Sequence, residues 1–189
     1  FDPENEDFYI ANSGSDELVK FSLHTAERYT FNHYVRKGSK REAHVNDLCF
    51  DNNKLFVSYF SASGNYKYGV FDGGVGVIDI ALEIDNKEVL KDLWKPHSPR
   101  ILDGNLYVLD SMRGELCDGK HRTLFSFNGF VRGLDKVEKL IVVGQSQDMY
   151  VSEHVGSNRT ISIDAGIYLC EEEFRMHKFY RIPEIMNIH

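Results

Sequence analysis

Side chains that could bind a ligand or transfer a proton recur in this sequence at the starts of short apolar segments. Six of them are nitrogen or oxygen donors at corresponding places in three segments: His44, Asn46, His97, Ser98, Arg100 and Arg132. Others follow the adjacent apolar residues: Asp110, Ser111, Glu115, Gln145 and Ser146. Imidazole, guanidinium, hydroxyl and carboxylate groups bind metals and anions or act as acids and bases. The set is compatible with two chemistries.

The first chemistry uses a divalent metal. His44 and His97 are the candidate metal ligands, and Asn46 and Glu115 offer oxygen atoms. Such an ion would acidify a water molecule or polarise a carbonyl group, with Glu115 and His97 as the catalytic residues. No HExxH motif or closely spaced Cys/His cluster supports the metal. The alternative is that each histidine bonds a backbone carbonyl at the start of a strand.

The second chemistry uses arginine to bind an anion. Arg100 and Arg132 carry planar donor groups that suit a carboxylate, sulfate or phosphate. The predicted ligand-binding residues are His44, Asn46, Ser98, Arg100, Ser111 and Arg132. A small polar or anionic molecule, of the sugar or sugar-acid type, is the expected ligand. The alternatives are that Arg100 pairs with Glu115, and that Asp110–Ser111 and Gln145–Ser146 only form turns.

The elements that would position these residues are short strands. Apolar and polar residues alternate with period two, and no segment shows a sustained helical stripe. The segment from Pro96 to Leu116 predicts a strand, a turn at Asp103-Gly104-Asn105, and a second strand. Similar segments begin at His44 and Val131. We therefore expect an all-β fold.

Repetition of these segments predicts a β-propeller. Apolar triplets begin at residues 8, 55, 106 and 140, and a repeat of about 40 to 50 residues built of four short strands is typical of a propeller blade. We expect about four antiparallel blades in a single domain, 1–189, or the C-terminal blades of a larger propeller. The first repeat lacks an innermost strand, which Glu184–Ile188 could supply. Polar residues on the innermost strands would then line an axial pocket.

Composition restricts the function further. Hydrophobic residues make up 42% of the chain and the net charge is −7, which is typical of a soluble globular protein and argues against a nucleic-acid partner. No window is long and apolar enough for a membrane span. The cysteines Cys49, Cys117 and Cys170 are far apart and odd in number. Buried free thiols and a cytoplasmic location are therefore expected.

Several ordered motifs resemble a known family. They are His44-Val-Asn46, His97-Ser-Pro-Arg100, Leu106-Tyr-Val-Leu-Asp-Ser111, Gly114-Glu-Leu116, Phe130-Val-Arg-Gly-Leu134 and Val143-Gly-Gln-Ser146. The series resembles an uncharacterised bacterial family of propeller-like proteins classified as a domain of unknown function. The resemblance implies a propeller and members with longer N-termini, and it implies no reaction.

Two functions remain as expectations. The first is a propeller that binds a small polar or anionic ligand in an axial pocket; if it is an enzyme, metal-assisted hydrolysis or lyase chemistry is expected. The second is a scaffold that binds a protein on one face without a reaction, since a propeller fold alone serves both uses.

Overall fold

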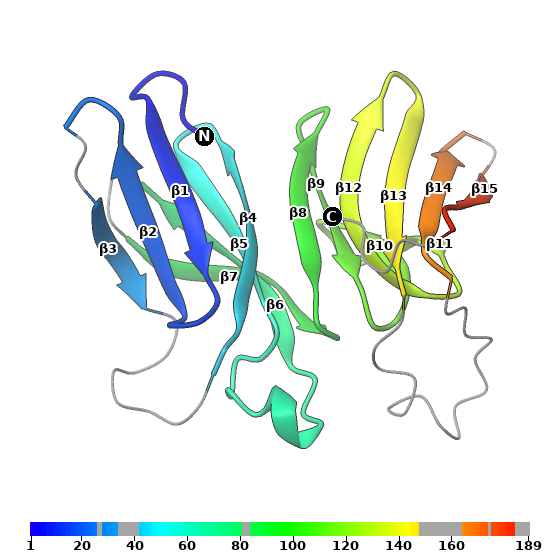
Figure 1. Ribbon diagram of the computed structural model, residues 1–189, viewed down its shortest axis with the longest axis horizontal. Helices are drawn as coiled ribbons and strands as arrows, with labels where there is room; N and C mark the ends of the chain where they lie inside the picture. Colours follow the sequence, from blue (N-terminus) through cyan, green and yellow to red (C-terminus); the bar gives the residue numbers. More distant parts are fainter. Residues whose placement is uncertain (26–27, 34–41, 81–83, 148–163, 174, 184–189) are drawn as a thin grey trace. The chain divides into compact units, whose positions relative to one another are not determined.

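The chain folds into two compact units, Phe1–Lys95 and Pro96–His189. The computed structural model describes residues 1–25, 28–33, 42–80, 84–147, 164–173 and 175–183 (Figure 1). Each unit holds two antiparallel sheets, and each unit is described by itself below. The expected single propeller domain, or fragment of a larger one, stays a prediction.

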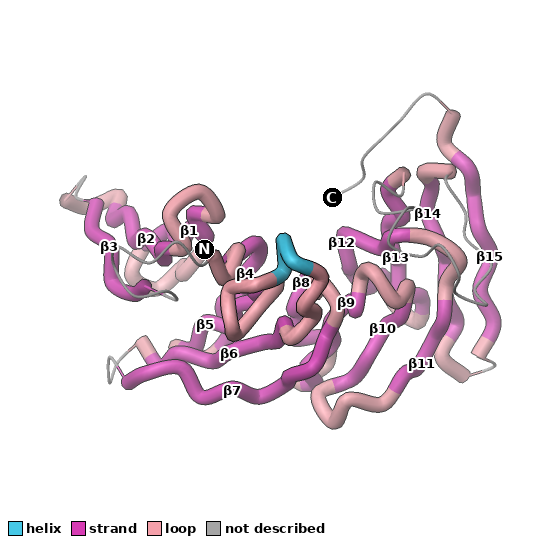
Figure 2. The backbone as a smooth tube through the Cα atoms, turned by 90° about the horizontal axis from the view of Figure 1, so that it is seen from below, coloured by secondary structure: helices cyan, strands magenta, loops and turns pink. Residues whose placement is uncertain are grey.

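The described residues of the first unit form seven strands. They are β1 (Asp7–Asn12), β2 (Glu17–Ser22), β3 (Arg28–His33), β4 (Val45–Asp51), β5 (Lys54–Tyr59), β6 (Gly73–Asp79) and β7 (Ile84–Leu93). One sheet has the order β1-β2-β3 and the other β4-β5-β6-β7. A short 3-10 helix, η1 (Tyr66–Tyr68), lies in the loop between β5 and β6 (Figure 2).

In the described part of the second unit there are eight strands. They are β8 (His97–Leu102), β9 (Asn105–Asp110), β10 (Glu115–Asp118), β11 (Thr123–Ser126), β12 (Phe130–Val137), β13 (Leu140–Ser146), β14 (Gly166–Glu171) and β15 (Met176–Arg181). Its sheets run β8-β9-β10-β11 and β12-β13-β14-β15. Every strand pairs with its neighbour in sequence, so the sheets are meanders. The predicted all-β class is confirmed, and three of the sheets have the expected four strands.

Tight turns join the first two strands of these sheets. Asn52 and Asn53 have φ of 47° and 57°, and Asp103 and Gly104 have φ of 49° and 74°. Two-residue hairpins need positive φ at both central positions, which Asn, Asp and Gly tolerate best. The turn predicted at Asp103-Gly104-Asn105 is confirmed.

Each unit has its own apolar core. In the second unit the core includes Leu109, Leu116, Phe125, Ile141 and Tyr168, all at most 5% exposed. In the first unit the core contains Tyr9, Leu18, Val45, Leu55, Val57 and Ile78. Alternation along each strand directs one set of side chains into these cores.

The alignment of the apolar triplets that begin at residues 8, 55, 106 and 140 is wrong by one residue in β13. Leu55 is buried, whereas Leu140, which was aligned with it, is 39% exposed and Ile141 is buried. In the hairpins Leu140 pairs with Val137 at the closing position, where β5 has Lys54. Because side chains alternate with period two, a shift of one residue exchanges the two faces of a strand.

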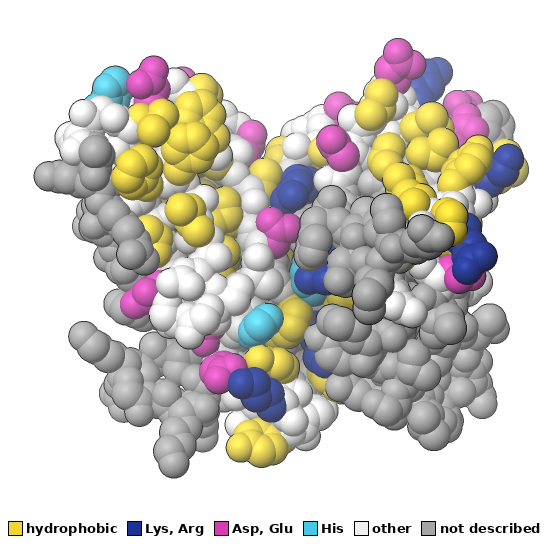
Figure 3. Space-filling model, in the orientation of Figure 1, with side chains coloured by type: hydrophobic (Ala, Val, Ile, Leu, Met, Phe, Trp, Pro, Cys, Tyr) yellow, Lys and Arg dark blue, Asp and Glu magenta, His cyan; other side chains and the backbone are white. Residues whose placement is uncertain are grey.

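Apolar side chains also lie on the faces opposite the cores. On the β12–β15 sheet, Val137, Leu140, Met176 and Tyr180 are between 39% and 60% exposed, and strand pairing places them on one face. We call this the outer face of the β12–β15 sheet. Figure 3 shows yellow side chains gathered there, and others over β1 and β2.

Some predicted features lie outside the described residues. These are the closing strand at 184–188, the strand at 160–163 and the basic segment at 36–41. In the part of the chain that the structure describes, no helix has the length and apolar character needed to cross a membrane.

Candidate functional site

A β-bulge interrupts the first strand of each four-stranded sheet. In β4 the pairing passes from Val45 opposite Tyr59 to Asp47 opposite Ser58, so Asn46 is the additional residue. Similar shifts lie between His97 and Arg100 in β8 and between Val131 and Leu134 in β12. Bulges redirect side chains and are common beside binding sites. The candidate residues Asn46, Ser98 and Arg132 all lie within these bulges.

The two bulges of the second unit are in contact. Ser98 is 2% exposed, has φ of 52°, and its Oγ accepts a hydrogen bond from the Gly133 backbone N–H at 3.0 Å. The neighbouring Arg132 guanidinium carbon lies 5.8 Å from the ring centre of Phe130. The structure therefore brings Ser98 and the Arg132–Gly133 segment together.

His97 occupies a buried position beside Ser111. Its Nδ1 lies 2.9 Å from Ser111 Oγ, and its ring meets the Phe130 ring edge-on at 5.5 Å. His97 is 6% exposed and Ser111 is fully buried. This contact joins the start of β8 to the residue after β9. Among the described residues, no group of three or more His, Cys, Asp or Glu side chains could hold a metal ion; the metal role of His97 stays a prediction.

A cleft of about 390 Å³ opens next to the β12 bulge. Its lining is partly polar and partly apolar: Arg100, Gly133, Leu134, Asp135, Val142, Gly144 and Ile167. The volume lies within the range of about 300–1,000 Å³ for small-molecule sites. Arg100 Nη1 donates to the Pro99 carbonyl oxygen at 2.8 Å, and this hydrogen bond restricts the orientation of the guanidinium group.

The lining of the cleft suits a hydroxylated anion. Asp135 Oδ1 accepts the Lys136 backbone N–H at 2.8 Å, and its carboxylate can accept hydrogen bonds from ligand hydroxyls. Arg100 can bind a carboxylate with a planar fork. Val142 and Ile167 come from adjacent strands on the same face of the sheet and offer apolar contact. Asp135 was not among the predicted site residues. It occupies a polar position in an alternating strand sequence, and nothing in the sequence distinguishes it from other polar strand residues.

Other candidates of the second unit lie on separate strands. Glu115 is on β10, two strands from β8, where its Oε2 accepts from Thr123 Oγ1 at 3.4 Å. The buried Asp110 forms an ion pair with Arg113 at 3.0 Å. No described contact joins Glu115 to His97, and the catalytic role of this pair stays a prediction.

Gln145 and Ser146 are buried at the end of β13. Gln145 Nε2 donates to the Asp164 carbonyl oxygen at 2.7 Å, and Oε1 accepts from the Tyr168 hydroxyl at 3.0 Å. These bonds hold the segment that leads into β14. Gln145 therefore has a structural role in the second unit.

A second group of polar side chains surrounds His44 in the first unit. His44 Nδ1 lies 3.3 Å from the Tyr66 hydroxyl, which donates to Glu42 Oε2 at 3.2 Å. Lys67 Nζ lies 2.6 Å from the same Glu42 oxygen. Tyr66, Glu42 and Lys67 were not predicted, because they come from the glycine-rich loop and from the residues before β4.

Burial and the nearby carboxylates shift the pKa of His44 in opposite directions. Burial lowers the pKa of its imidazole, and the carboxylates of Asp16 and Glu42 partly oppose this shift. The hydrogen bond from Lys67 lowers the pKa of Glu42. A neutral imidazole beside an ionised carboxylate is the expected state at neutral pH.

Asn46 also lies in the first unit, where its Oδ1 accepts from Ser58 Oγ at 2.5 Å. His44 and Asn46 thus belong to one unit, and His97, Ser98, Arg100, Ser111 and Arg132 to the other. The shared axial pocket stays a prediction.

Meander sheets with bulged first strands define a propeller-like all-β protein. The family described as a domain of unknown function (DUF4915) matches residues 6–166, and the chain belongs to it. This confirms the resemblance at the level of a family without an assigned function. No curated protein matches the sequence.

Solved structures share the fold at low sequence identity. A chain of a nidogen/laminin complex matches with a TM-score of 0.64 and 9% identity, covering 96% of this chain and 62% of that one. Oligogalacturonate lyase from Vibrio parahaemolyticus matches with a TM-score of 0.54 and 13% identity, covering 95% and 51%. An alpha-L-arabinofuranosidase from Clostridium thermocellum matches with 0.52 and 11%, covering 94% and 69%.

These similarities concern the fold alone. The propeller-like enzymes among them support the propeller-like class of this chain. The chain spans 62% of the nidogen/laminin chain and about half of the lyase.

Proposed function

We propose that this protein binds a small hydroxylated anion, of the sugar-acid type, in the cleft beside the β12 bulge. The observation that carries the proposal is the presence of Arg100 and Asp135 in one cleft of about 390 Å³. Arg100 binds the carboxylate, Asp135 accepts from hydroxyl groups, and Val142 and Ile167 contact the C–H face of the ligand. The likeness of the fold to a lyase and a glycosidase that act on sugars is consistent with this ligand class.

Calorimetric titration with D-galacturonate, D-glucuronate, D-gluconate and neutral D-galactose tests the proposal. We expect at least one of the acids to bind and galactose to bind at least tenfold more weakly. Arg100→Ala should abolish binding of the acid, and Arg100→Lys should weaken it, because lysine keeps the charge but loses the planar fork.

Arg122→Ala provides the matched control. Arg122 is an exposed arginine paired with Asp118, and it does not line the cleft. Its replacement should leave the affinity unchanged. Equal loss of binding in Arg122→Ala and Arg100→Ala, or no heat with any of the four sugars, would contradict the proposal.

The second candidate function is a protein-interaction scaffold. The observation that favours it is the exposed outer face of the β12–β15 sheet, with Val137, Leu140, Met176 and Tyr180. Apolar sheet faces of this kind pack on further sheets in layered β proteins. A flat response in the sugar titrations would favour this function.

Metal-assisted hydrolysis or lyase chemistry is the reaction we propose if the bound acid is turned over. The cleft holds an acidic side chain and a cation, Asp135 and Arg100, which are suited to binding. Turnover of galacturonate-containing oligosaccharides with and without divalent metal, followed by product absorbance or reducing ends, tests this step. Activity that persists in Arg100→Ala would exclude the cleft as its site.

A further inference from the structure

The first unit holds His44 in a fixed position. The carboxylate of Asp16, which is 5% exposed, accepts the backbone N–H groups on both sides of His44, from Ala43 at 2.8 Å and from Val45 at 2.9 Å. His44 itself has φ of 54°, an unusual conformation for a residue other than glycine. Strained backbone of this kind persists where the surroundings impose it, and it is common at functional sites.

The ring of His44 is fixed as well. It lies 4.4 Å from the ring centre of Phe60 and 5.2 Å from that of Tyr66. Asn65 donates its backbone N–H to Ser61 Oγ, which in turn donates to Asp72 Oδ1, and these bonds hold the loop that carries Tyr66. Among the described residues, the charged groups that act on the ring are Asp16, Glu42, Lys67 and Lys95.

The hydrogen bonds determine which ring nitrogen carries the proton. A carboxylate only accepts, so the Tyr66 hydroxyl donates to Glu42, and bonds to an ionised acceptor are the stronger ones. The phenol oxygen then accepts from His44 Nδ1–H. A neutral imidazole has one N–H, so Nε2 carries the lone pair. No described residue makes a hydrogen bond to Nε2.

We propose that His44 is a proton acceptor: Tyr66 and Glu42 hold its proton on Nδ1, so that Nε2 can take the proton of a ligand hydroxyl group. Tyr66 and Glu42 are positioning residues that act through His44. His44 is partly exposed and the Lys67 side chain, which pairs with Glu42, is 59% exposed, so this group of side chains lies at the surface of the first unit. This site lies wholly in the first unit and does not depend on the cleft beside the β12 bulge.

The proton transfer balances without a further reactant. The Nε2 lone pair forms the new N–H bond, and the electron pair of the broken O–H bond stays on the ligand oxygen. The positive charge on the imidazolium then interacts through the Tyr66 hydroxyl with the Glu42 carboxylate. The arrangement is that of a base oriented by a hydrogen bond to its other ring nitrogen.

Long-range ¹H–¹⁵N spectra of the whole ¹⁵N-labelled chain at pH 7.5 test the assignment. We expect Nδ1 of His44 to bear the proton and Nε2 to show the shift of an unprotonated nitrogen; His44→Gln identifies the signals. Tyr66→Phe removes the acceptor of the Nδ1–H, and Glu42→Met removes the acceptor of the Tyr66 hydroxyl, which then donates to Nδ1; both should move the proton toward Nε2. Glu42→Met leaves the Phe60–His44–Tyr66 packing in place, so it tests the same point if Tyr66→Phe fails to fold.

Acylation by diethyl pyrocarbonate provides a second measurement. An unprotonated imidazole nitrogen attacks the reagent, so His44 should react several-fold more slowly in Tyr66→Phe and Glu42→Met than in the wild type, as measured by peptide mass spectrometry. The exposed His24 is the internal reference. Tyr68→Phe is the matched control, because Tyr68 is 85% exposed.

The assignment is overturned if His44 carries its proton on Nε2 in the wild type. It is also overturned if neither Tyr66→Phe nor Glu42→Met changes the tautomer and the acylation rate, or if Tyr68→Phe changes them equally.

Discussion

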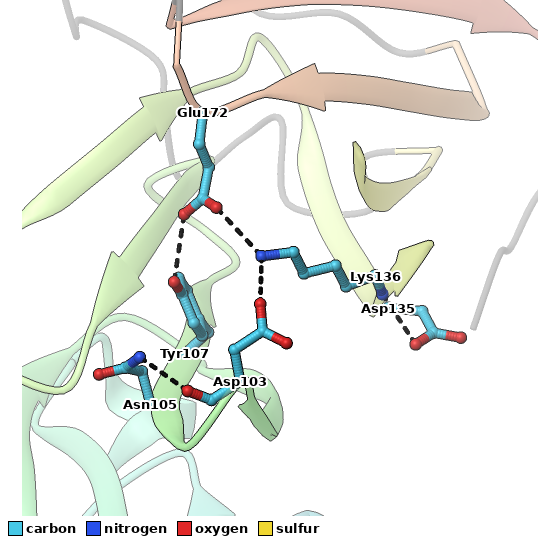
Figure 4. Close-up of polar contacts among 6 residues, drawn as sticks. All are labelled: Asp103, Asn105, Tyr107, Asp135, Lys136 and Glu172. Atoms are coloured by element: carbon cyan, nitrogen blue, oxygen red, sulfur yellow. Dashed lines mark hydrogen bonds and ion pairs between the residues drawn. The ribbon is translucent and has the colours of Figure 1, made fainter. Parts of the chain in front are cut away.

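Lys136 joins three parts of the second unit through one ammonium group. Its Nζ lies 2.6 Å from Asp103 Oδ2 and 3.3 Å from Glu172 Oε2, and the Tyr107 hydroxyl donates to the other Glu172 oxygen at 3.1 Å (Figure 4). Only 15% of the Lys136 side chain is exposed. The network therefore connects the β8–β9 turn, β12 and the residues after β14.

We expect Lys136→Met to destabilise the protein by about 1 kcal/mol, the upper end for ion pairs near a surface. The hydrogen bond to Asp103, followed by that to Glu172, raises the pKa of Lys136. The stabilisation is fully present below the unfolded-state pKa, about 10.4, and is lost as the pH rises through the higher folded-state pKa. Urea unfolding of both proteins from pH 7 to 11 measures this difference.

Lys139→Met, at an exposed lysine in the next turn, is the control for this series. Its unfolding free energy should stay within about 0.5 kcal/mol of the wild type. A stability difference for Lys136→Met that grows above pH 10.5 would contradict the ion-pair explanation.

The three thiols should differ in reactivity. Burial raises the pKa of Cys117 and of Cys170 to about 12, so both stay protonated at pH 8, whereas Cys49 is partly exposed. The thiolate is the reactive form. We expect one thiol per chain, Cys49, to react with a maleimide in the native protein and three in 6 M guanidinium chloride; native labelling of Cys117 or Cys170 would contradict the core packing.

At the scale of strands, the glycine-rich segment has a packing role. A Cβ at Gly74 would lie 2.4 Å from the Leu90 carbonyl oxygen and 2.7 Å from the Tyr59 hydroxyl. Residues 73–76 form the first part of β6. Glycine is needed here because the backbone of β7 approaches closely.

Gly74→Ala should cost about 1–3 kcal/mol, as expected for overpacking. Gly14→Ala is the matched control, because the nearest atom to a Cβ there is Asn12 Oδ1 at 3.7 Å. Thermal unfolding of the two variants measures the difference. Equal melting temperatures of the Gly74→Ala and Gly14→Ala variants would show that β6 and β7 can move apart without loss of stability.

The sequence predicted most strands because their signals are local. Alternation and the Asn52-Asn53 and Asp103-Gly104 turns define hairpins without tertiary information. Strand register is less local: a Leu begins three of the aligned triplets, yet Leu140 faces solvent. Hydrophobicity alone could not place it, because both faces of the β12–β15 sheet carry apolar side chains.

The candidate site was predictable only in part. The polar residues at strand starts marked the bulges, as Asn46, Ser98 and Arg132 show. Tyr66 could not be found in this way, because it reaches His44 through a loop whose path depends on Ser61 and Asp72. Glu42, which precedes β4, was missed because its contact is with Tyr66 of that loop. Asp135 could not be separated from an ordinary exposed strand residue.

At the scale of the whole molecule, each unit presents apolar surface besides its core. On the outer face of the β12–β15 sheet we expect binding of the dye ANS by the native protein, because contiguous exposed apolar side chains form its sites. The double variant Val137→Thr/Met176→Lys should reduce the fluorescence, with an unfolding free energy within about 0.5 kcal/mol of the wild type.

Phe8→Thr is the comparison for this measurement, since Phe8 is a 41% exposed apolar residue of the other unit. Phe8→Thr should lower the ANS fluorescence by an amount that adds to the decrease in the double variant. Native protein that binds no dye would mean that both surfaces are covered in solution.

The bulges of β4, β8 and β12 have a consequence for how such proteins diverge. A residue in a bulge stands outside the regular ladder, so another side chain can replace it while every flanking pair keeps its partner. The cost of such a replacement then depends on burial. Ser98 is 2% exposed and its Oγ accepts the Gly133 N–H, whereas Arg132 is partly exposed, so a library randomised at Arg132 should yield more folded variants than one randomised at Ser98.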